Sequence, residues 1–480
     1  MARRSTRHGL AVGLSVAVPL LMTAAVAVAL LVPSVAPSAG GRTAAAVSWT
    51  AAQLGVPADA FTDGAGYAGP ISCPAVGGCV VLGEYSSASG LEEDFIATQK
   101  AGVWSAVRAP LPTGGTQAAN LGPYTLACTG VGDCVGASLY QSATSVAADV
   151  LEERGGVWSA VAMPLPANAS PSRFPTVAAM TCPRLGDCVI AGTYTTTSGL
   201  SEGLVVTEEG KVFVAAEAPT PSASNEGSAL FGVACTAAAA CAAVGDYVAP
   251  SGRRQALIVN DVAGALTAVR PPLPPGAAPN PHAELQTVAC GSATGCVALG
   301  TYLGANGDSL GVIDTSSSGT WSAGTTPTPT GASSDPSPAV FAVTCKGATF
   351  CLGVGQYTDS TGRTQGLVLI DQSGAWSASI MPATDNRHVV VRAVACASVT
   401  SCAAAGHYVL DGEQVGYLMT LSGSTLSAST SSLPANASSS PAEDLGFVSC
   451  RYIATCTVSG NYNGAGSTTV ELPLTVSETP

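Results

Sequence analysis

The sequence predicts an all-β protein, a single eight-bladed β-propeller over residues 47–480. Three observations lead to this fold class. All sixteen cysteines form eight pairs with i, i+6 spacing, and successive pairs begin 51 to 55 residues apart. A tyrosine stands six residues after the second cysteine of every pair. A fixed period of this length indicates a repeat architecture in which each unit packs on its neighbours.

The composition agrees with many short strands. The chain has 480 residues, of which only 10% are charged, with 55 glycines and 32 prolines. Such a composition favours strands and turns over long helices. The net charge is −13 and only three lysines occur, so no basic face is available to neutralise phosphates. We therefore expect no nucleic-acid partner, and the thinly spread acidity is interpreted as a solubility feature.

The first residues are interpreted as a targeting segment. Residues 1–8 carry three arginines and form the expected cytoplasmic tail, and residues 9–32 are uncharged. A run of this length can be either a cleaved signal peptide or an uncleaved transmembrane helix. Residues 33–46 are the expected linker. Positive charge before the run orients the body outward, so both alternatives place it outside the cell, secreted or at the cytoplasmic membrane.

One repeat unit contains four expected strands. An aliphatic and a small residue precede the first cysteine, as in Val233-Ala234-Cys235. After the second cysteine, apolar residues occupy successive positions, which indicates a strand that is buried on both faces. An aliphatic run (366–370) and a Gly-x-Trp turn such as Gly374-Ala-Trp376 supply the third and fourth strands. A four-stranded unit covered on both sides by its neighbours is a propeller blade.

Prolines close the units. They stand six residues after the tryptophan, or after Phe213 or Leu266 in its place, at Pro110, Pro164, Pro219, Pro272, Pro327 and Pro382. Because proline donates no ladder hydrogen bond, it protects an exposed edge strand. A ligand role of the P-x-P clusters for proline-reading modules is the disfavoured alternative.

The spacing also predicts ring closure. The tryptophan position follows the second cysteine by 24 or 25 residues in the other units, so after Cys456 it would fall at 480 or 481, where the sequence stops. Trp49 stands 24 residues before Cys73, the same interval that separates Trp104 from Cys128. We expect the strand around Trp49 to complete the eighth blade.

The cysteine pairs are expected to be disulfides. Facing ends of a hairpin bring two Cα atoms within disulfide range. Zinc sites favour shorter spacers and histidine, and the chain has only four histidines. No metal and no cofactor is expected. The expected bonds join Cys73 to Cys79, Cys128 to Cys134, Cys182 to Cys188, Cys235 to Cys241, Cys290 to Cys296, Cys345 to Cys351, Cys396 to Cys402 and Cys450 to Cys456.

One position varies in chemistry within the constant framework, namely the residue before each repeat tyrosine. It is Leu139 in one unit and polar in the other seven, at Glu84, Thr193, Asp246, Thr301, Gln356, His407 and Asn461. These seven are the candidate ligand-contacting residues of a channel rim. The alternative, which is favoured, is a solvent-facing strand end. The eight tyrosines are interpreted as packing residues.

No catalytic constellation is found. His407 has no identifiable partner in the sequence, which disfavours a general base. The acidic clusters 92–94, 152–153 and 208–209 fall at different offsets in their units and are interpreted as solvated turns. No nucleophile elbow, phosphate loop or His-Glu metal motif occurs.

The units resemble the repeats of exported bacterial β-propeller proteins, of the SC-x5-C-x-A-x-G-x-Y … G-x-W-S type common in actinobacterial sequences. The resemblance covers residues 47–480 and implies fold and export, but no activity. A weaker likeness links 371–376 (DQSGAW) to the aspartate-box turn of sialidase-type propellers, although its glycine stands one residue late.

Three functions are considered. The favoured hypothesis is a non-enzymatic extracellular binding or scaffold module for an unidentified protein or glycan, expected to be a monomer, whose membrane contact is limited to an uncleaved N-terminal segment. The alternative is a carbohydrate-active enzyme, a glycosidase or lyase, which needs two carboxylates; Glu84 and Asp246 are the only acidic members of the variable position. The third is a purely structural envelope protein.

Overall fold

The computed structural model describes residues 47–479 apart from 62–63, 117–124, 174, 222–225, 238–239, 263, 293–294, 318, 383–388, 453–454 and 466–469. The regular structure of this part consists of strands β1 to β32, arranged in eight four-stranded antiparallel sheets. Within the described ranges no helix has the length and apolarity needed to cross a bilayer. The helix expected over 9–32 lies outside the described residues.

Each sheet is one blade, and its four strands are ordered from the ring axis to the outer edge. The blades are numbered 1 to 8 by their innermost strands, which are β2 (Gly66–Ala75), β6 (Thr125–Gly130), β10 (Thr176–Thr181), β14 (Ser228–Ala237), β18 (Glu284–Ser292), β22 (Ala339–Cys345), β26 (Val389–Ser398) and β30 (Asp444–Cys450). The second strands are β3 (Gly78–Ser86), β7 (Asp133–Gln141), β11 (Val189–Thr195), β15 (Ala240–Val248), β19 (Gly295–Leu303), β23 (Phe350–Thr358), β27 (Ser401–Leu410) and β31 (Cys456–Asn463).

The outer half of each blade follows the same order. The third strands are β4 (Glu92–Lys100), β8 (Val146–Arg154), β12 (Ser201–Glu209), β16 (Arg254–Val262), β20 (Ser309–Ser317), β24 (Thr364–Gln372), β28 (Glu413–Ser422) and β32 (Glu471–Thr479). The outermost strands are β5 (Val103–Arg108), β9 (Val157–Ala162), β13 (Val212–Glu217), β17 (Ala265–Val269), β21 (Thr320–Thr325), β25 (Ala375–Ile380), β29 (Thr425–Ser429) and, in blade 8, β1 (Ser48–Gln53).

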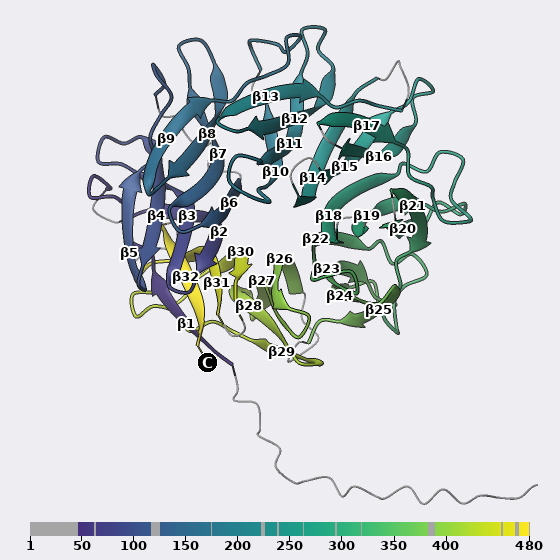
Figure 1. The fold of residues 1–480 in the computed structure, drawn as a ribbon. Helices are drawn as coiled ribbons and strands as arrows, with labels where there is room; N and C mark the ends of the chain where they lie inside the picture. Colours follow the sequence, from purple (N-terminus) through teal and green to yellow (C-terminus); the bar gives the residue numbers. More distant parts are fainter. Residues whose placement is uncertain are drawn as a thin grey trace, which may run out of the picture. The chain divides into compact units, whose positions relative to one another are not determined.

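The blades form a closed ring. Each innermost strand contacts the innermost strand of the next blade, and β30 of blade 8 contacts β2 of blade 1 (Figure 1). Blade 8 takes its outermost strand from the other end of the sequence, because β1 pairs antiparallel with β32. Trp49 lies opposite Glu478 in this pairing, as Trp376 lies opposite Asp371 in blade 6. The predicted closure is therefore confirmed.

The hydrophobic core lies between the blades. Consecutive residues of a second strand belong to different core clusters: Val81 packs in the cluster that contains Phe447 of blade 8, whereas Leu82 packs with Leu151 of blade 2. Successive side chains of a strand point to opposite faces, so a strand covered on both sides needs apolar residues at successive positions. This is why the segment after the second cysteine is mostly apolar, although blade 8 has buried Thr457 and Ser459 there.

All eight expected disulfides are present, each within one blade, and their Cα–Cα distances lie between 3.9 and 4.2 Å. In blade 4 the two bonded residues are directly opposite each other in the pairing of β14 with β15, so the bond closes the inner hairpin. Disulfides at this density favour an oxidising, extracellular environment. The bonds join Cys73 to Cys79, Cys128 to Cys134, Cys182 to Cys188, Cys235 to Cys241, Cys290 to Cys296, Cys345 to Cys351, Cys396 to Cys402 and Cys450 to Cys456.

Candidate functional site

A β-bulge recurs in the innermost strands. In blade 4 the pairing of β14 with β15 skips one residue between Leu230 and Gly232, and the same shift occurs in the other innermost strands whose pairing reaches this point. In blade 1 the shift skips two residues, between Ala68 and Ile71. A bulge redirects a side chain and is a designed feature of a strand. The single skipped residues stand four positions before the first cysteine of their unit, at Ala178, Phe231, Gln286, Phe341, Arg392 and Gly446.

We call these bulge residues the axial residues. Four of them are exposed, and two, Gln286 and Gly446, are half-buried. Phe231 is 37% exposed although it stands between buried Leu230 and Gly232, and Phe341 is 40% exposed. Neighbouring blades cover both faces of an innermost strand, so an exposed side chain on it projects toward the axis. The axial residues differ in chemistry from blade to blade, whereas the strands that carry them share one pattern.

The bulge explains the repeat glycine that follows the second cysteine by four residues. A Cβ on Gly300 would overlap the carbonyl oxygen of Glu284, because the bulge brings the start of β18 against β19. The other repeat glycines meet the equivalent carbonyl in the same way. Ser138 is the one exception, and its hydroxyl donates a hydrogen bond to the Asp94 carboxylate of blade 1.

The seven sequence-predicted rim residues lie one strand farther out, on the second strands. Asp246 and Asn461 are buried, and the other five are half-buried. The structure distributes them one to a blade, and Leu139 of blade 2 is buried. The Asn461 side-chain oxygen accepts a hydrogen bond from the backbone N–H of Ala68 in blade 1, 2.8 Å away. The Asn461 side chain thus connects two neighbouring blades. A role of the seven residues in ligand contact stays a prediction.

A polar network joins blades 7, 8 and 1 at the axis. Asp444, the first residue of β30, binds Arg392 through one carboxylate oxygen (Nη1–Oδ2, 2.9 Å) and His407 through the other (Nδ1–Oδ1, 2.9 Å). The expectation that His407 has no partner was wrong, because the partner belongs to the next repeat. Burial of Asp444 opposes its ionisation, but the His407 hydrogen bond and the Arg392 charge together lower the pKa of Asp444.

Tyr67 of blade 1 adjoins this network. Burial, followed by the negative charge of Asp444, raises the pKa of Tyr67. Its hydroxyl lies 4.0 Å from the point where a Cβ on Gly446 would stand, so the missing side chain of this axial residue leaves room for the tyrosine. The network holds the Arg392 guanidinium at the axis, where its remaining N–H groups can donate to an acceptor on a ligand.

A second network joins blades 4 and 5. Arg254 binds Asp246 (Nε–Oδ2, 2.7 Å) and Glu284 (Nη1–Oε2, 3.0 Å), and the axial Gln286 donates to Glu284 (2.9 Å). Burial raises the pKa of Asp246 to about 6, although the Arg254 charge opposes the shift. Glu84 belongs to blade 1, so blades 2 and 3 stand between it and Asp246.

Two acidic pairs share a geometry that the sequence analysis did not find. Glu153 lies opposite Trp158, and Glu208 lies opposite Phe213, which is the same repeat position. The offsets differ because the turn before the third strand covers 142–145 in blade 2 and 196–200 in blade 3. Both glutamates are buried, as are Glu93 and Asp94 of β4, so the interpretation as solvated turns was wrong for these four residues. Glu208 accepts from the backbone N–H of Cys188, 3.3 Å away.

All eight repeat tyrosines are buried. Three of them donate their hydroxyl to a side chain 26 residues earlier in the sequence: Tyr194 to Asn168 (2.9 Å), Tyr462 to Asn436 (2.8 Å) and Tyr85 to Asp59 (2.9 Å). These bonds tie the connection from the preceding blade to the second strand.

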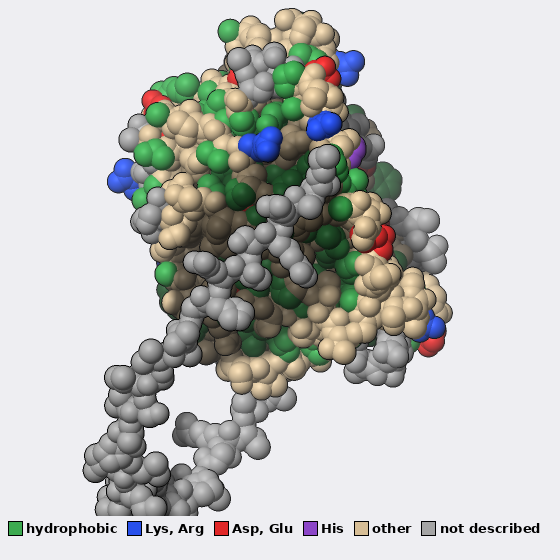
Figure 2. Space-filling view, turned by 90° about the vertical axis from the view of Figure 1, so that its right-hand side faces the viewer, with side chains coloured by type: hydrophobic (Ala, Val, Ile, Leu, Met, Phe, Trp, Pro, Cys, Tyr) green, Lys and Arg blue, Asp and Glu red, His purple; other side chains and the backbone are tan. Residues whose placement is uncertain are grey.

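Among the described residues, no group of three or more His, Cys, Asp or Glu side chains could hold a metal ion. On the side of the ring seen in Figure 2, charged side chains are few and scattered.

The comparisons with known proteins assign no activity. No family model and no curated protein matches the chain. Among solved structures, it is similar to YCF48 from Cyanidioschyzon merolae (12% identity, TM-score 0.39, covering 78% of this chain and 98% of that one) and to YCF48 bound to D1 peptide (13%, 0.37, 74% and 93%). It is also similar to Trypanosoma rangeli sialidase (12%, 0.35, 79% and 56%), and so spans little more than half of that sialidase.

Proposed function

We propose that this chain is an exported, disulfide-stapled β-propeller that binds a protein or glycan through its axial residues without catalysing a reaction. The observation that carries the proposal is the bulge, which presents a chemically variable residue toward the axis from a framework whose glycine and disulfide positions recur. A variable residue on a constant framework is what a recognition surface needs, whereas a packing role would favour one repeated residue type.

The chemistry of the axial residues supports binding. Phe231 and Phe341 offer aromatic faces, and Gln286 and Arg392 offer hydrogen-bond donors that the two polar networks hold in place. Aromatic and arginine side chains contribute most of the energy in many interfaces. Because the innermost strands are closed by disulfides, little conformational entropy is lost when a ligand binds.

The disulfides and the N-terminal segment support export. Eight disulfides need an oxidising compartment to form and persist. The uncharged run at 9–32, preceded by arginines, would direct the ring across the cytoplasmic membrane, after which it is either released or remains anchored.

The test is ligand capture by the full-length protein on glycan arrays and cell-envelope fractions, followed by affinity measurements with variants. Phe341→Ala and Arg392→Ala are each expected to weaken binding by about tenfold or more, because such truncations cost over about 1.4 kcal/mol at an interface centre. The matched control is Phe61→Ala, a 51% exposed phenylalanine on the connection between β1 and β2. Equal affinity of the axial variants and the control would refute the axial surface.

A further inference from the structure

An aromatic residue of each Gly-x-Trp turn packs on the preceding blade. Trp158 of blade 2 packs with Leu82 and Ile96 of blade 1, and Trp321 of blade 5 packs with Val244 and Ile258 of blade 4. Each seam between two blades therefore has a fixed place for an indole-sized group. We call this place the indole position of the seam.

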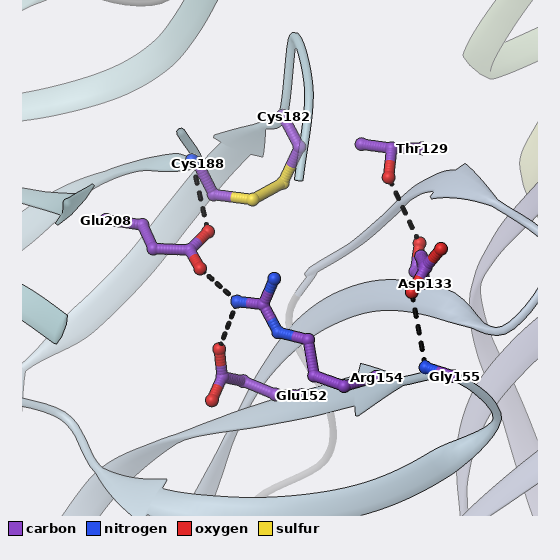
Figure 3. Close-up of polar contacts among 8 residues, drawn as sticks. All are labelled: Thr129, Asp133, Glu152, Arg154, Gly155, Cys182, Cys188 and Glu208. Atoms are coloured by element: carbon purple, nitrogen blue, oxygen red, sulfur yellow. Dashed lines mark hydrogen bonds and ion pairs between the residues drawn. A yellow bond between two sulfur atoms is a disulfide. The ribbon is translucent and has the colours of Figure 1, made fainter. Parts of the chain in front are cut away.

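The seam between blades 2 and 3 also holds a half-buried cation, the Arg154 guanidinium. Phe213 occupies the indole position, and Arg154, the last residue of β8, reaches from blade 2 to the fully buried carboxylate of Glu208 in blade 3 (Figure 3). Arg154 also binds Glu152 (Nη2–Oε1, 2.7 Å). A buried carboxylate needs such a partner, because desolvation of an unpaired charge is costly.

The seam between blades 3 and 4 lacks both groups. Leu266 stands at the indole position, opposite Asp261, which takes the place of Glu208. Glu209, the last residue of β12, takes the place of Arg154. Two carboxylates therefore occur where the preceding seam has an ion pair. Among the described residues, neither carboxylate forms an ion pair with a cationic side chain. Lys211, on the adjoining turn, is paired with neither of them.

A cavity of about 440 Å³ occupies this seam. Its size falls in the range of small-molecule sites. Asp261 is only 6% exposed, and its Oδ1 accepts from the backbone N–H of Gly264, 2.9 Å away. Asp261 and Glu209 both line the cavity. The apolar wall is formed by Val189, Val205, Val214 and Ala216 of blade 3 and by Leu266 of blade 4.

A leucine at the indole position is not sufficient to create such a cavity. Leu426 of blade 7 stands at the same position, and buried Phe350 of blade 6 packs in the same cluster. Phe350 precedes the second cysteine of its unit, and the equivalent residue at the seam of blades 3 and 4 is Asp187, which pairs with Arg184. The bulk that blade 6 provides is thus absent from blade 3.

We propose that the cavity between blades 3 and 4 binds a small compound that has an aromatic ring and an ammonium group. The ring packs on Val205 and Leu266, at the indole position, and the ammonium group lies between Glu209 and Asp261. The compound thereby supplies the two groups that Phe213 and Arg154 supply one seam earlier. This site is separate from the axial residues and does not depend on the proposed function.

The first experiment is calorimetric titration of the full-length protein with tryptamine, which combines an indole with a primary ammonium. Binding with a dissociation constant of about 1 mM or tighter is expected from its roughly twelve non-hydrogen atoms. Neutral indole should bind about tenfold more weakly because it lacks the charge. Indole-3-acetate, an anion, should not bind. Equal affinity for tryptamine and indole-3-acetate would overturn the proposal, as would no binding of tryptamine.

Variants locate the binding. Leu266→Trp fills the indole position and should abolish tryptamine binding, whereas Leu426→Trp is the matched control in blade 7 and should retain it. Glu209→Gln changes an exposed residue and should weaken tryptamine binding about two- to fivefold without changing indole binding, so it tests the site even if Leu266→Trp fails to fold. Unchanged tryptamine affinity in Glu209→Gln would refute the ammonium position. A capped Trp-Lys peptide that binds over about tenfold more tightly than tryptamine would overturn the assignment to a small compound.

Discussion

Trp49 lies opposite Glu478, where the first described strand of the chain pairs with the last. The indole packs with Ala403 and Leu418 of blade 7. Trp49 of blade 8 therefore packs on the preceding blade, as the Gly-x-Trp tryptophan does in other blades. The ring is therefore closed by side-chain packing as well as by backbone hydrogen bonds.

Trp49→Ala is expected to lower the free energy of unfolding by about 3–5 kcal/mol, since the indole is buried and a cavity would remain. Urea unfolding followed by circular dichroism measures the change. Val103→Ala, on the exposed face of β5, is the control and should change stability by less than about 0.5 kcal/mol. A loss for Trp49→Ala as small as that of the control would contradict the closure.

The disulfides should be complete and each should stabilise the fold. Thiol titration in denaturant without reductant should find no free sulfhydryl. Removing one bond by the paired substitutions Cys396→Ala and Cys402→Ala should lower stability by about 2 kcal/mol, because the bond closes only a short loop in the unfolded chain. Several titratable thiols per chain in the unreduced protein would disagree with this account.

Asp314 should make the stability depend on pH. Its side chain is 0% exposed and neither carboxylate oxygen has a hydrogen-bond partner among the described residues. Burial raises its pKa to about 7, above the unfolded value, so the folded state retains a proton that the unfolded state loses. Stability contributed by the neutral form is complete below pH ~4 and is lost as pH rises toward ~7.

Asp314→Val tests this dependence. The variant should gain up to about 4 kcal/mol at pH ~8 and less at pH ~5, at about 1.4 kcal/mol per pKa unit. Denaturant melts at both pH values measure it. An equal gain at the two pH values would show that Asp314 does not titrate in this range. The other blades carry an aliphatic residue at this repeat position, namely Ala97, Leu151, Val206, Val259, Leu369, Met419 and Val476.

Gly300→Ala is expected to destabilise the protein by more than about 3 kcal/mol, because the new Cβ would overlap the carbonyl oxygen of Glu284. Gly324→Ala in β21 is the matched control, since its nearest heavy atom lies 4.0 Å from the added Cβ. Chemical denaturation of both variants decides the matter. Similar stability of the two would mean that the bulge does not press on Gly300.

The fold could be predicted because its markers recur at fixed spacing. The cysteines locate the inner hairpin, and the interval to the tryptophan is regular enough to show that Trp49 completes blade 8. The cysteine pair and the interval to the tryptophan are local properties of one repeat. Because the repeat recurs at a fixed period, they locate the equivalent strands in every blade.

The axial residues were missed because a bulge breaks the alternation of side chains along the innermost strand. In a regular strand, residues four apart lie on the same face of the sheet. Alternation from Cys235 therefore gives no reason to expect that Phe231 points toward the axis. A signal did exist, since the residue four positions before each first cysteine varies between units.

Contacts between repeats were also missed. The pair of His407 with Asp444 was not found because its partner starts the next blade. One-residue differences in turn length concealed the shared position of Glu153 and Glu208. Both kinds of contact depend on how neighbouring units are placed in space, which the spacing within one unit does not record.

The most direct test of the closed ring is a cross-link between its two end strands. Thr50 and Ser477 are partners in the pairing of β1 with β32. The double variant with Thr50→Cys and Ser477→Cys should form an additional disulfide within one chain, detected by peptide mass mapping without reduction, and should leave the eight native bonds intact. An introduced pair that stays reduced, or that links only separate molecules, would contradict the account.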